Sequence, residues 1–330
     1  MTSELSPRVT ICLPTIGRLT YMQETLDSLK AQTLDDYELL ILYNGTDSAV
    51  LEKLHQMAGE HPGGRVLPDE NRMPMFANFN RGLREARGEY VAFFHDDDVY
   101  EPNFLSRTIA ELDAFPHAAF AGSNYYIIDS HSRLTGHRRL IKRTFVQPGH
   151  DFIRELVRRG RGAIPTPGIV FRKSVFDERG WDETLSMHFG DFVVLMEMAE
   201  AHDAMLIAEP LLRIRLHGRN ASNVPLSIAG PMLYGTLVKY AENLEERWPH
   251  MSDFARELRH SSRATLRRFL VWGWVSADEE EEAQRCTALL RENGHRLVAA
   301  ALDAVGAIGL GAAHRRGIAG ALRKLGRVTS

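Results

Sequence analysis

The sequence predicts an α/β fold, with a mainly parallel sheet covered by helices on both faces, followed by a C-terminal helical region. Short, continuously apolar runs alternate with amphipathic segments from residue 9 to about residue 115, as expected for buried parallel strands joined by crossover helices. Past about residue 225 the apolar positions recur with helical spacing. A chain of 330 residues is long enough for one large domain and an appendage.

The composition is that of an ordinary soluble protein, with 44% hydrophobic and 25% charged residues. The net charge of −3 offers no global basic field, so no nucleic-acid partner is expected. Cys12 and Cys286 form no CxxC pattern, which indicates a reducing compartment. The N-terminus lacks a secretory pattern, and the apolar stretch Val298–Ala313 is shorter than the roughly 20 residues that span a bilayer. A cytoplasmic location is therefore expected.

In the first half we expect four strands, at Val9–Leu13, Glu38–Leu42, Arg65–Leu67 and Tyr90–Phe94. Helices are expected between them, at Thr20–Leu34, Ser48–Gly59 and Met75–Arg87. Thr20 and Gln23 have the spacing of a capping box, and Gly88 is placed to end the third helix. Pro102 opens a further helix that runs to Phe115.

From about residue 116 the pattern is mixed. We expect a strand at Ala118–Ile128, a mobile basic loop at His131–His150, a helix at Phe152–Arg159, a strand at Gly168–Arg172 and a helix at Phe192–Ala201. Farther on, Ser276 and Glu279 are spaced as a capping box for a helix through Asn293. We therefore divide the chain into residues 1–224 and a helical region, residues 225–330.

Three consecutive aspartates, Asp96 to Asp98, follow the fourth expected strand. Parallel sheets bind ligands beyond the carboxyl ends of their strands, and "PTIGR" (14–18) and "YNGTD" (43–47) follow the first two strands. Clustered carboxylates suit a hard divalent cation that shares its oxygen ligands with phosphates. The triplet by itself is equally explained by a solvated turn or by aspartates that cap the next helix.

Five segments together resemble the family 2 glycosyltransferases, which have the GT-A fold. In family order they are "PTIGR", "LDSLKAQTLDDYELLILYNGTDS", "ENRMPMFANFNRGLREARGEYVAFFHDDDVYEP", "GWDETL" and "HFGDFVV". They span about the first 220 residues, and their shared order makes the resemblance specific although each motif alone is weak. The resemblance extends to bacterial enzymes of cell-surface polysaccharide assembly.

The resemblance implies a metal site for Mn²⁺ or Mg²⁺. Asp97 matches the metal-binding aspartate, Asp98 supports it, and Asp96 lies towards the ribose or the metal. His217, in "LRIRLHGRNAS", matches a third ligand, although a histidine after a strand is as often structural. The cation would stabilise the leaving nucleoside diphosphate. His95 stands where many members carry an aspartate, and a polar residue at a strand end is its simpler interpretation.

The resemblance also implies a nucleotide site across the first two strand ends. Its candidate residues are Pro14, Thr15 and Arg18 in the first loop, Asn44 at the base edge with Asp47 nearby, and Arg72 and Arg81 for the diphosphate. Either arginine could instead lie on a helix surface. Ile16 replaces the usual tyrosine, and an asparagine at position 44 can donate or accept a hydrogen bond, so the base stays open.

Asp191, in "HFGD", matches the family's catalytic carboxylate. Displacement at the anomeric carbon needs a base for the acceptor hydroxyl, whereas an N-cap of the following helix is the structural alternative. By the same resemblance Asp182 and Glu183 fit an acceptor-side loop, and Arg215 and Asn220 could contact phosphate or acceptor. "IPTPGIVFR" (164–172) would border the acceptor site.

The implied function is inverting, metal-dependent transfer of a sugar from a nucleotide-sugar donor to a saccharide or lipid-linked acceptor, in polysaccharide or glycolipid biosynthesis. Another metal-dependent nucleotide-sugar enzyme, a nucleotidyltransferase or a hydrolase, is the first alternative. A nucleotidyltransferase should have a glycine-rich basic loop after its first strand, and "PTIGR" has one glycine and one arginine. An inactive binding module on the same fold is the second alternative.

The C-terminal segment, residues 294–330, is basic and amphipathic. It has six Lys and Arg residues against one acidic residue, Asp303. Its apolar residues include Leu297, Leu302, Ile308, Leu310, Ile318, Leu322 and Leu325. Such a segment can lie on an anionic membrane surface, here the inner face of the membrane, or it can pack on the catalytic domain or on a second subunit.

Overall fold

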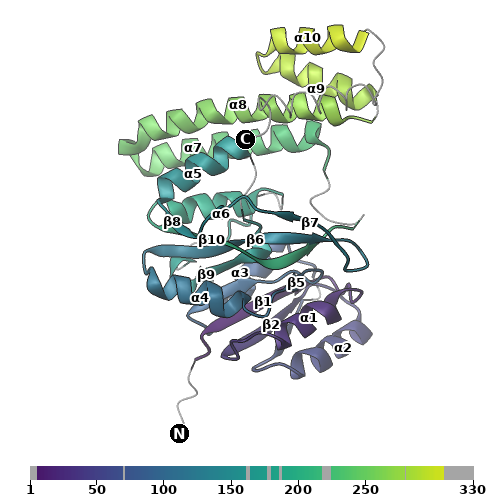
Figure 1. Cartoon of the computed structure of the whole chain (residues 1–330), viewed down its shortest axis with the longest axis vertical. Coiled ribbons are helices and arrows are strands. Elements are labelled where there is room, and N and C mark those ends of the chain that lie inside the picture. Colours follow the sequence, from purple (N-terminus) through teal and green to yellow (C-terminus); the bar gives the residue numbers. More distant parts are fainter. Residues whose placement is uncertain are drawn as a thin grey trace. The chain divides into compact units, whose positions relative to one another are not determined.

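The computed structural model describes residues 6–69, 71–160, 164–176, 180–185, 188–217, 224–278 and 280–307 (Figure 1). The chain forms two compact units. The first consists of Met1–Ile153 and Gly162–Asn220, and the second of Arg154–Arg161 and Ala221–Ser330. Each unit has its own hydrophobic core, and we describe them separately.

The first unit is built on one sheet, which has ten strands among the described residues and the order β3-β2-β1-β4-β9-β6-β10-β5. Its parallel part consists of β1 (Val9–Thr15), β2 (Tyr37–Tyr43), β3 (Arg65–Pro68) and β4 (Tyr90–Phe93). β9 (Ile169–Arg172) runs antiparallel between β4 and β6 (Ala118–Ile128), and β6 is parallel to β10 (Asp203–Arg215). β5 (Val99–Tyr100) and β8 (Phe145–Gln147) pair with β10, and β7 (Leu134–Arg138) pairs with β6.

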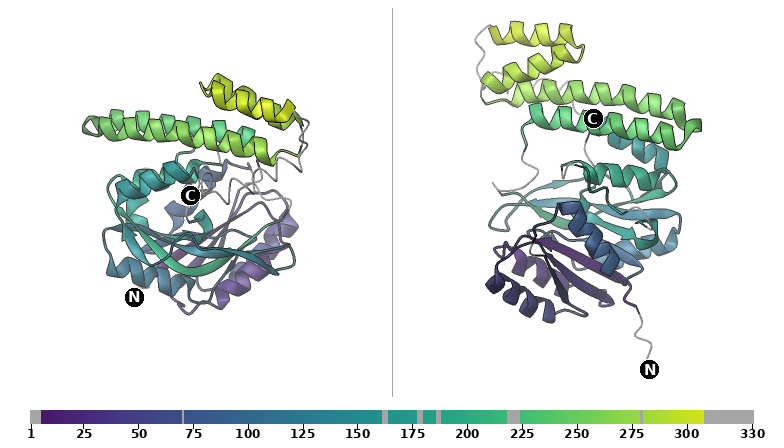
Figure 2. Two further views of the ribbon diagram at one scale, coloured as in Figure 1. Left: turned by 45° about the horizontal axis from the view of Figure 1, so that its top comes forward. Right: turned by 180° about the vertical axis from the view of Figure 1, so that it is seen from behind.

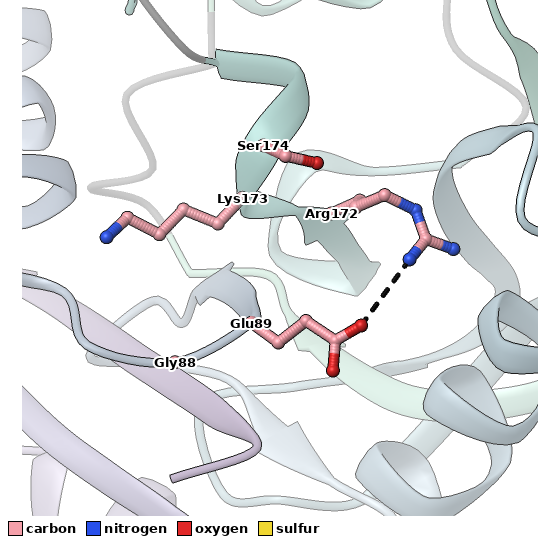
Figure 3. A pocket seen from close by; sticks show the side chains of 5 residues that line it. All are labelled: Gly88, Glu89, Arg172, Lys173 and Ser174. Carbon is pink, nitrogen blue, oxygen red and sulfur yellow. Dashed lines mark ion pairs between the residues drawn. The ribbon is translucent and has the colours of Figure 1, made fainter. Parts of the chain in front are cut away.

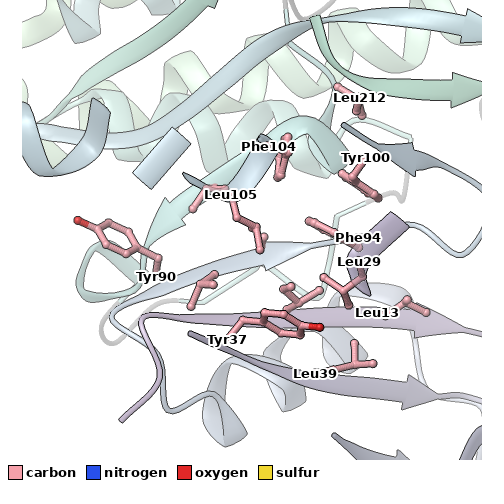
Figure 4. Close-up of a cluster of buried hydrophobic side chains, with 14 of the residues drawn as sticks. Leu13, Leu29, Tyr37, Leu39, Tyr90, Phe94, Tyr100, Phe104, Leu105 and Leu212 are labelled. Atoms are coloured by element: carbon pink, nitrogen blue, oxygen red, sulfur yellow. The ribbon is translucent and has the colours of Figure 1, made fainter. Parts of the chain in front are cut away.

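Helices cover both faces of this sheet, which confirms the predicted α/β class. They are α1 (Met22–Lys30), α2 (Ser48–Gly59), α3 (Met75–Glu85), α4 (Phe104–Ala114) and α6 (Gly190–Ala199). Alternate strand residues such as Leu13, Leu39 and Phe94 pack with α1, α2 and α4 in one buried cluster (Figure 4). On the other face Gly82 of α3 lies so close to Cys12 and Leu42 that a Cβ atom would meet the Cys12 sulfur at 2.9 Å. Successive side chains of a strand point to opposite faces of the sheet. The same strands therefore supply apolar side chains to the hydrophobic layers on both faces.

An aromatic cluster fills the second face. Trp181, from "GWDETL", is 2% exposed, and its ring stacks on Phe76 with centroids 5.3 Å apart. It also meets Phe79 of α3 and Phe93 of β4 edge to face. The tryptophan of this motif therefore belongs to the core, and its backbone carries the neighbouring acidic residues.

The second unit is helical, which confirms the predicted helical region. It contains α7 (Leu226–Arg247), η3 (Pro249–Met251), α8 (Ser252–Ser276), α9 (Glu280–Glu292) and α10 (Arg296–Ala307), together with the end of α5 (Gly149–Arg159). α7 and α8 lie side by side along their length (Figure 2). Leu270, Trp274, Cys286 and Leu290 are among the residues of its core. Within the described residues no helix is both long enough and apolar enough to span a membrane.

The capping signals predicted at Thr20 and at Gly88 are wrong. α1 begins at Met22 after Tyr21, without a side-chain cap, and Gln23 instead donates to Asp27 Oδ1 at 2.9 Å. α3 ends at Glu85, before Gly88. Gly88 is needed for a different reason, because a Cβ atom there would lie 2.5 Å from the backbone nitrogen of Thr10.

The expected mobile loop at His131–His150 contains β7 and β8 and the start of α5. Its residues are mostly polar and exposed, so their sequence has no strand pattern. They become strands because β6 and β10 offer free backbone edges to pair with. The expected capping box at Ser276 is wrong, because Ser276 ends α8 and its hydroxyl donates to the Trp272 carbonyl at 2.8 Å. Glu279 lies outside the described residues, and α9 begins at Glu280.

Candidate active site

The ends of β1, β2 and β4 bring the three expected motifs together. The three strands are mutually parallel, so their carboxyl ends share one edge of the sheet. The Thr15 hydroxyl donates to Asp96 Oδ2 at 2.6 Å, and the backbone N–H of Asn44 donates to the Thr15 carbonyl at 2.9 Å. Pro14, half-buried, is in register with Leu42. "PTIGR", "YNGTD" and "HDDD" therefore meet at one edge, as their positions after strands predicted.

The aspartates of the acidic turn, Asp96 to Asp98, are not equivalent. Asp98 is 2% exposed; burial and the neighbouring Asp97 charge raise its pKa well above the usual range. Burial also raises the pKa of Asp96, to about 6, although the hydrogen bond from Thr15 opposes the shift. Asp97 is partly exposed. The positive charge near the turn therefore does not balance the negative charge that its three carboxylates would carry. Such an imbalance favours a bound cation.

Arg215, at the end of β10, lies behind this turn and is 1% exposed. Its backbone N–H donates to Asp98 Oδ1 at 2.9 Å, and its Nε donates to the Asp97 carbonyl at 2.8 Å. The rest of the guanidinium contacts Glu24 and the turn between β6 and β7. These contacts contradict the prediction that Arg215 contacts phosphate or acceptor, because the buried guanidinium already serves protein acceptors.

His217 follows two residues later, and its Nε2 lies 3.0 Å from Asp97 Oδ2. Its ring stacks on Tyr21 with centroids 5.5 Å apart. Two ligand atoms that each bind one ion at about 2.1 Å in neighbouring octahedral positions lie about 3 Å apart. The same 3.0 Å is an ordinary hydrogen-bond distance between imidazole and carboxylate, so the pair is compatible with a divalent cation and does not require one.

A second donor set shares Asp97. Ligand atoms of His95, Asp97 and Asp98 all lie within 4.8 Å of one another, and His95 Nδ1 is 3.9 Å from Asp98 Oδ2. Burial lowers the pKa of His95, against the nearby charge of Asp97. Asp97 is therefore the residue on which both arrangements converge, and the ligand roles of Asp98 and His217 stay predictions.

Asp191 lies in the first turn of α6, where its Oδ2 accepts a 2.7 Å hydrogen bond from the Thr166 hydroxyl. The N-cap of α6 is Phe189, but Asp191 Oδ1 also accepts the backbone N–H of Phe192 in the first turn at 2.9 Å, so a structural role at the helix start and the catalytic role both stay predictions. Burial raises the pKa of Asp191, although the hydrogen bond from Thr166 opposes the shift. Gly190 permits the position, because a Cβ atom there would lie 2.1 Å from the Phe76 ring.

The β-sheet register places Thr166 near the acidic turn. β9 is antiparallel to β4, with Val170 opposite Ala92. The short helix η1 (Thr166–Gly168), which precedes β9, therefore lies beyond the end of β4. Asp191 reaches the edge that carries Asp97 through this contact, and the sequence signal for it was the "IPTPG" segment.

The two residues expected near the nucleotide base differ in whether their side-chain oxygens already have hydrogen-bond donors in the protein. Asn44 Nδ2 donates to the Met73 carbonyl at 2.8 Å, whereas its Oδ1 is buried and has no partner among the described residues. Asp47 caps α2, where its Oδ1 accepts the backbone N–H groups of Ala49 at 2.9 Å and Val50 at 3.2 Å. Asn44 therefore keeps a free acceptor, while the carboxylate of Asp47 has a structural task.

The three candidate arginines also differ. Arg18 is exposed, and its charge contributes to lowering the pKa of Asp96 against the effect of burial. Arg72 is exposed, has a φ of +50° and makes no ion pair within the described part of the chain. Arg81 donates to the carbonyls of Pro68 at 2.7 Å and Leu67 at 2.9 Å. Arg81 therefore holds the end of β3, and its role at a diphosphate stays a prediction.

The acidic residues of "GWDETL" serve their own loop. Asp182 Oδ1 accepts the Thr184 N–H at 2.9 Å, and Glu183 Oε1 accepts the Asn80 amide at 2.9 Å. Their acceptor-side role stays a prediction, and Asn220 lies outside the described residues. Tyr21, Glu24 and Ser132 reach the site through Arg215 and His217, and no motif in the sequence marked them.

A hollow of about 300 Å³ lies at the opposite end of β4 (Figure 3), lined by Gly88, Glu89, Arg172, Lys173 and Ser174. Gly88 and Glu89 precede the first residue of β4, whereas the acidic turn follows its last. Arg172 pairs with Glu89 at 3.6 Å and donates to the Leu112 carbonyl at 2.8 Å. Lys173 donates to the Ala86 carbonyl, so both cations of the lining have protein partners, and the hollow is separate from the candidate site.

Comparison with known proteins identifies the family. The family model described as "Glycosyl transferase family 2" matches residues 10–180. The uncharacterized protein y4gI of Sinorhizobium fredii is 27% identical over 216 residues, which are 60% of this chain and 23% of that protein. The putative glycosyltransferase EpsH of Bacillus subtilis is 30% identical over 104 residues, 32% of this chain and 30% of EpsH. The chain thus spans less than a third of the length of either relative.

Two solved structures share the fold. TarS 1–349 of S. aureus superposes with a TM-score of 0.61 at 16% identity, over 87% of this chain and 80% of that chain. The mannosyltransferase PcManGT of Pyrobaculum calidifontis, solved with GDP-Man and Mn²⁺, superposes with a TM-score of 0.55 at 17% identity, over 92% and 80% of the two chains. Since the family model covers half of its length, the chain belongs to glycosyl transferase family 2 and has the GT-A fold.

Proposed function

We propose that the chain is an inverting, metal-dependent glycosyltransferase that moves a sugar from a nucleotide-sugar donor to an acceptor hydroxyl. The observation that carries this proposal is the meeting of three polar pairs at one sheet edge. They are Thr15 with Asp96, His217 with Asp97, and Thr166 with Asp191. Family membership and the donor complexes of the structural neighbours support it, with UDP-GlcNAc in TarS and GDP-Man in PcManGT.

Asp97 and His217 would hold the divalent cation, with Asp98 behind them. We favour this pair over the set with His95 because His217 Nε2 lies 3.0 Å from Asp97 Oδ2, whereas His95 Nδ1 lies 3.9 Å from Asp98 Oδ2. A bound cation would offset the charge that develops on the leaving diphosphate. Both Mn²⁺ and Mg²⁺ suit the oxygen donors, and the imidazole nitrogen favours Mn²⁺.

The nucleotide would lie across the ends of β1 and β2. Pro14 and Thr15 form the wall of this site, and Thr15 orients Asp96 toward the ribose or the metal. The free Oδ1 of Asn44 suits a base that presents a ring N–H group, as uracil and guanine do. The exposed Arg18 and Arg72 would face the diphosphate, whereas Asp47 and Arg81 would act by holding α2 and β3 in place.

Asp191 would be the general base. It takes the proton of the acceptor hydroxyl, the freed oxygen bonds to C1 of the sugar, and the bond from C1 to the diphosphate oxygen breaks. Attack from the side opposite the leaving group inverts the configuration at C1. A raised pKa makes the Asp191 carboxylate a better proton acceptor, and the Thr166 hydroxyl holds one of its oxygens in place.

The direct test is a thermal-shift screen of nucleotide-sugars with Mn²⁺ or Mg²⁺, because a bound ligand raises the melting temperature by mass action. The donor that binds is then used in transfer assays with wild-type protein and with Asp191→Asn. We expect the variant to bind the donor with near wild-type affinity and to lose transfer by about 10²–10⁴-fold. Unimpaired transfer in Asp191→Asn would overturn the base assignment, and donor hydrolysis without transfer to any acceptor would favour a hydrolase.

We also propose roles for the two regions of the chain. Residues 1–224 would carry catalysis on a saccharide or lipid-linked acceptor of polysaccharide or glycolipid assembly. Residues 225–330 would contact an anionic membrane at its inner face or a second copy of the chain. Two features of the described residues support such a contact: Leu297 is 88% exposed, and α8 carries four arginines and no acidic residue from Leu258 to its end. The buried, unpaired thiols of Cys12 and Cys286 suit the cytoplasm.

A further inference from the structure

We propose that Arg215 is a positioning residue, whose buried guanidinium ties the acidic turn to α1 and to the β6–β7 turn and thereby sets where Asp97 and His217 present their ligand atoms. The inference rests on the proposed function, because it concerns the cation of that site. It adds a residue that touches neither substrate nor metal.

Arg215 contacts the acidic turn at two points. Its backbone N–H donates to Asp98 Oδ1 at 2.9 Å, and its Nε donates to the Asp97 carbonyl at 2.8 Å. His217, on the same strand end, approaches the Asp97 carboxylate from two residues further along. A change in the position of Arg215 would therefore shift both donors of the cation together.

The far side of the guanidinium is fixed by two other elements. One terminal nitrogen donates to Glu24 Oε2 of α1 at 2.6 Å. The other donates to the Ser132 hydroxyl at 2.8 Å and to the Asp129 carbonyl at 3.2 Å. Tyr21 covers the guanidinium, 4.4 Å from its ring centroid, and stacks on His217. Arg215 and His217 are thus joined through the tyrosine as well as along the strand.

The β6–β7 turn has a backbone feature that fits this role. Ser132 has a φ of +62°, a conformation that residues other than glycine adopt at a cost. Its hydroxyl donates to Glu24 Oε2 at 2.8 Å while it accepts the hydrogen bond from Arg215. Asp129 closes the turn by accepting the backbone N–H groups of His131 at 2.8 Å and Arg133 at 3.0 Å. The strained serine therefore links the two charged partners, where a glycine would fit the backbone better.

The charge of Arg215 has a second consequence. The guanidinium meets the acidic turn at the backbone carbonyl of Asp97, not at its carboxylate. The acidic turn thus already contains one cation from the protein itself. Because that cation lies behind the turn, the Asp97 carboxylate remains available in front of it.

The experiment compares Mn²⁺ affinity, measured by titration calorimetry on the full chain, in wild type and in Arg215→Lys, which keeps the charge and loses the forked geometry. Changes to residues that hold metal ligands cost about 10–100-fold in affinity, and we expect a loss in that range. Saturating Mn²⁺ should restore most of the transfer activity of Arg215→Lys. The matched control is Arg172→Lys, at the opposite end of β4, which should lose stability and keep wild-type Mn²⁺ affinity.

Ser132→Gly separates positioning from folding. Glycine relieves the positive φ and removes the hydroxyl that links Glu24 to Arg215. We expect a melting temperature within a few degrees of wild type and Mn²⁺ affinity several-fold weaker. Simple destabilisation could not produce this combination.

The outcomes separate this inference from the function on which it rests. Weaker Mn²⁺ binding in Arg215→Lys and Ser132→Gly, without sugar transfer by wild type, supports the inference and overturns the proposed function. Wild-type Mn²⁺ affinity in Arg215→Lys, with transfer intact, overturns the inference alone. Absence of Mn²⁺ binding to wild type overturns the inference together with metal dependence.

Discussion

The two ends of the parallel strands both bury carboxylates, and they neutralise them differently. At the amino ends Glu38 is 1% exposed and accepts hydrogen bonds from the Thr10 hydroxyl at 2.7 Å and from Arg87 Nε at 2.8 Å. Burial raises the pKa of Glu38, but the bonds from Arg87 and Thr10 outweigh it and leave the pKa lowered. At the carboxyl ends burial prevails, and the pKa values of Asp96 and Asp98 are raised.

This difference indicates what each end does. A fully compensated carboxylate joins segments that are distant in sequence, and it needs no ligand. A cluster of carboxylates whose negative charge is only partly compensated is unfavourable when ionised, and a bound cation relieves this. Groups with such perturbed pKa values are found preferentially at functional sites. Removing one carboxylate at a time tests whether the two ends differ in this way.

Asp97→Asn should have the largest effect. It removes the negative charge of the residue shared by both possible donor sets, and a bound cation contributes several kcal/mol to the transition state. We expect transfer to fall by about 10³-fold and the melting temperature without metal to stay the same or to rise. Transfer assays at saturating Mn²⁺ and a thermal melt check the two parts. An active variant would mean that the acidic turn is only a solvated turn.

Glu38→Gln should destabilise the protein and leave transfer unchanged. Hydrogen bonds to a buried charged group contribute about 1.5–3 kcal/mol, so we expect unfolding free energy to fall by about 2 kcal/mol at pH 7. Because the pKa of Glu38 is lowered in the folded state, its stabilisation is present above its usual pKa and is lost as the pH falls through the lowered value. Denaturant melts of wild type and variant should therefore converge at acid pH. Divergence there would contradict the assignment.

Asp98→Asn should change stability less than Glu38→Gln does, and in the opposite direction. The amide oxygen can still accept the Arg215 N–H, and a buried carboxyl with a raised pKa is unfavourable when ionised. We expect the free energy of unfolding at pH 7 to stay unchanged or to rise by about 1 kcal/mol, while Mn²⁺ binding weakens. A loss of stability comparable to that of Glu38→Gln would erase the contrast between the two ends.

Local patterns predicted much of the fold. Ser48–Gly59 and Ala118–Ile128 have the predicted bounds, because amphipathic spacing and an apolar run are visible in the sequence without a partner segment. The strands β7 and β8 were not visible, since their residues are polar and pair only because β6 and β10 lie beside them. The three motifs of the candidate site were also predictable, because each directly follows an apolar run that is visible in the sequence.

The sequence by itself determined the fold class, the family and the residues placed at the carboxyl ends of the parallel strands, because those follow from short apolar runs and from motifs read in order. Only the tertiary structure decided which charges are compensated. Arg215 was expected at the ligand and lies buried behind Asp97, paired with a glutamate 191 positions away. Asp191 was open to a role at the helix start, and the structure gives it two donors, the backbone N–H of Phe192 in α6 and the distant Thr166 hydroxyl. Compensation depends on burial and on partners distant in sequence, and no local pattern encodes either.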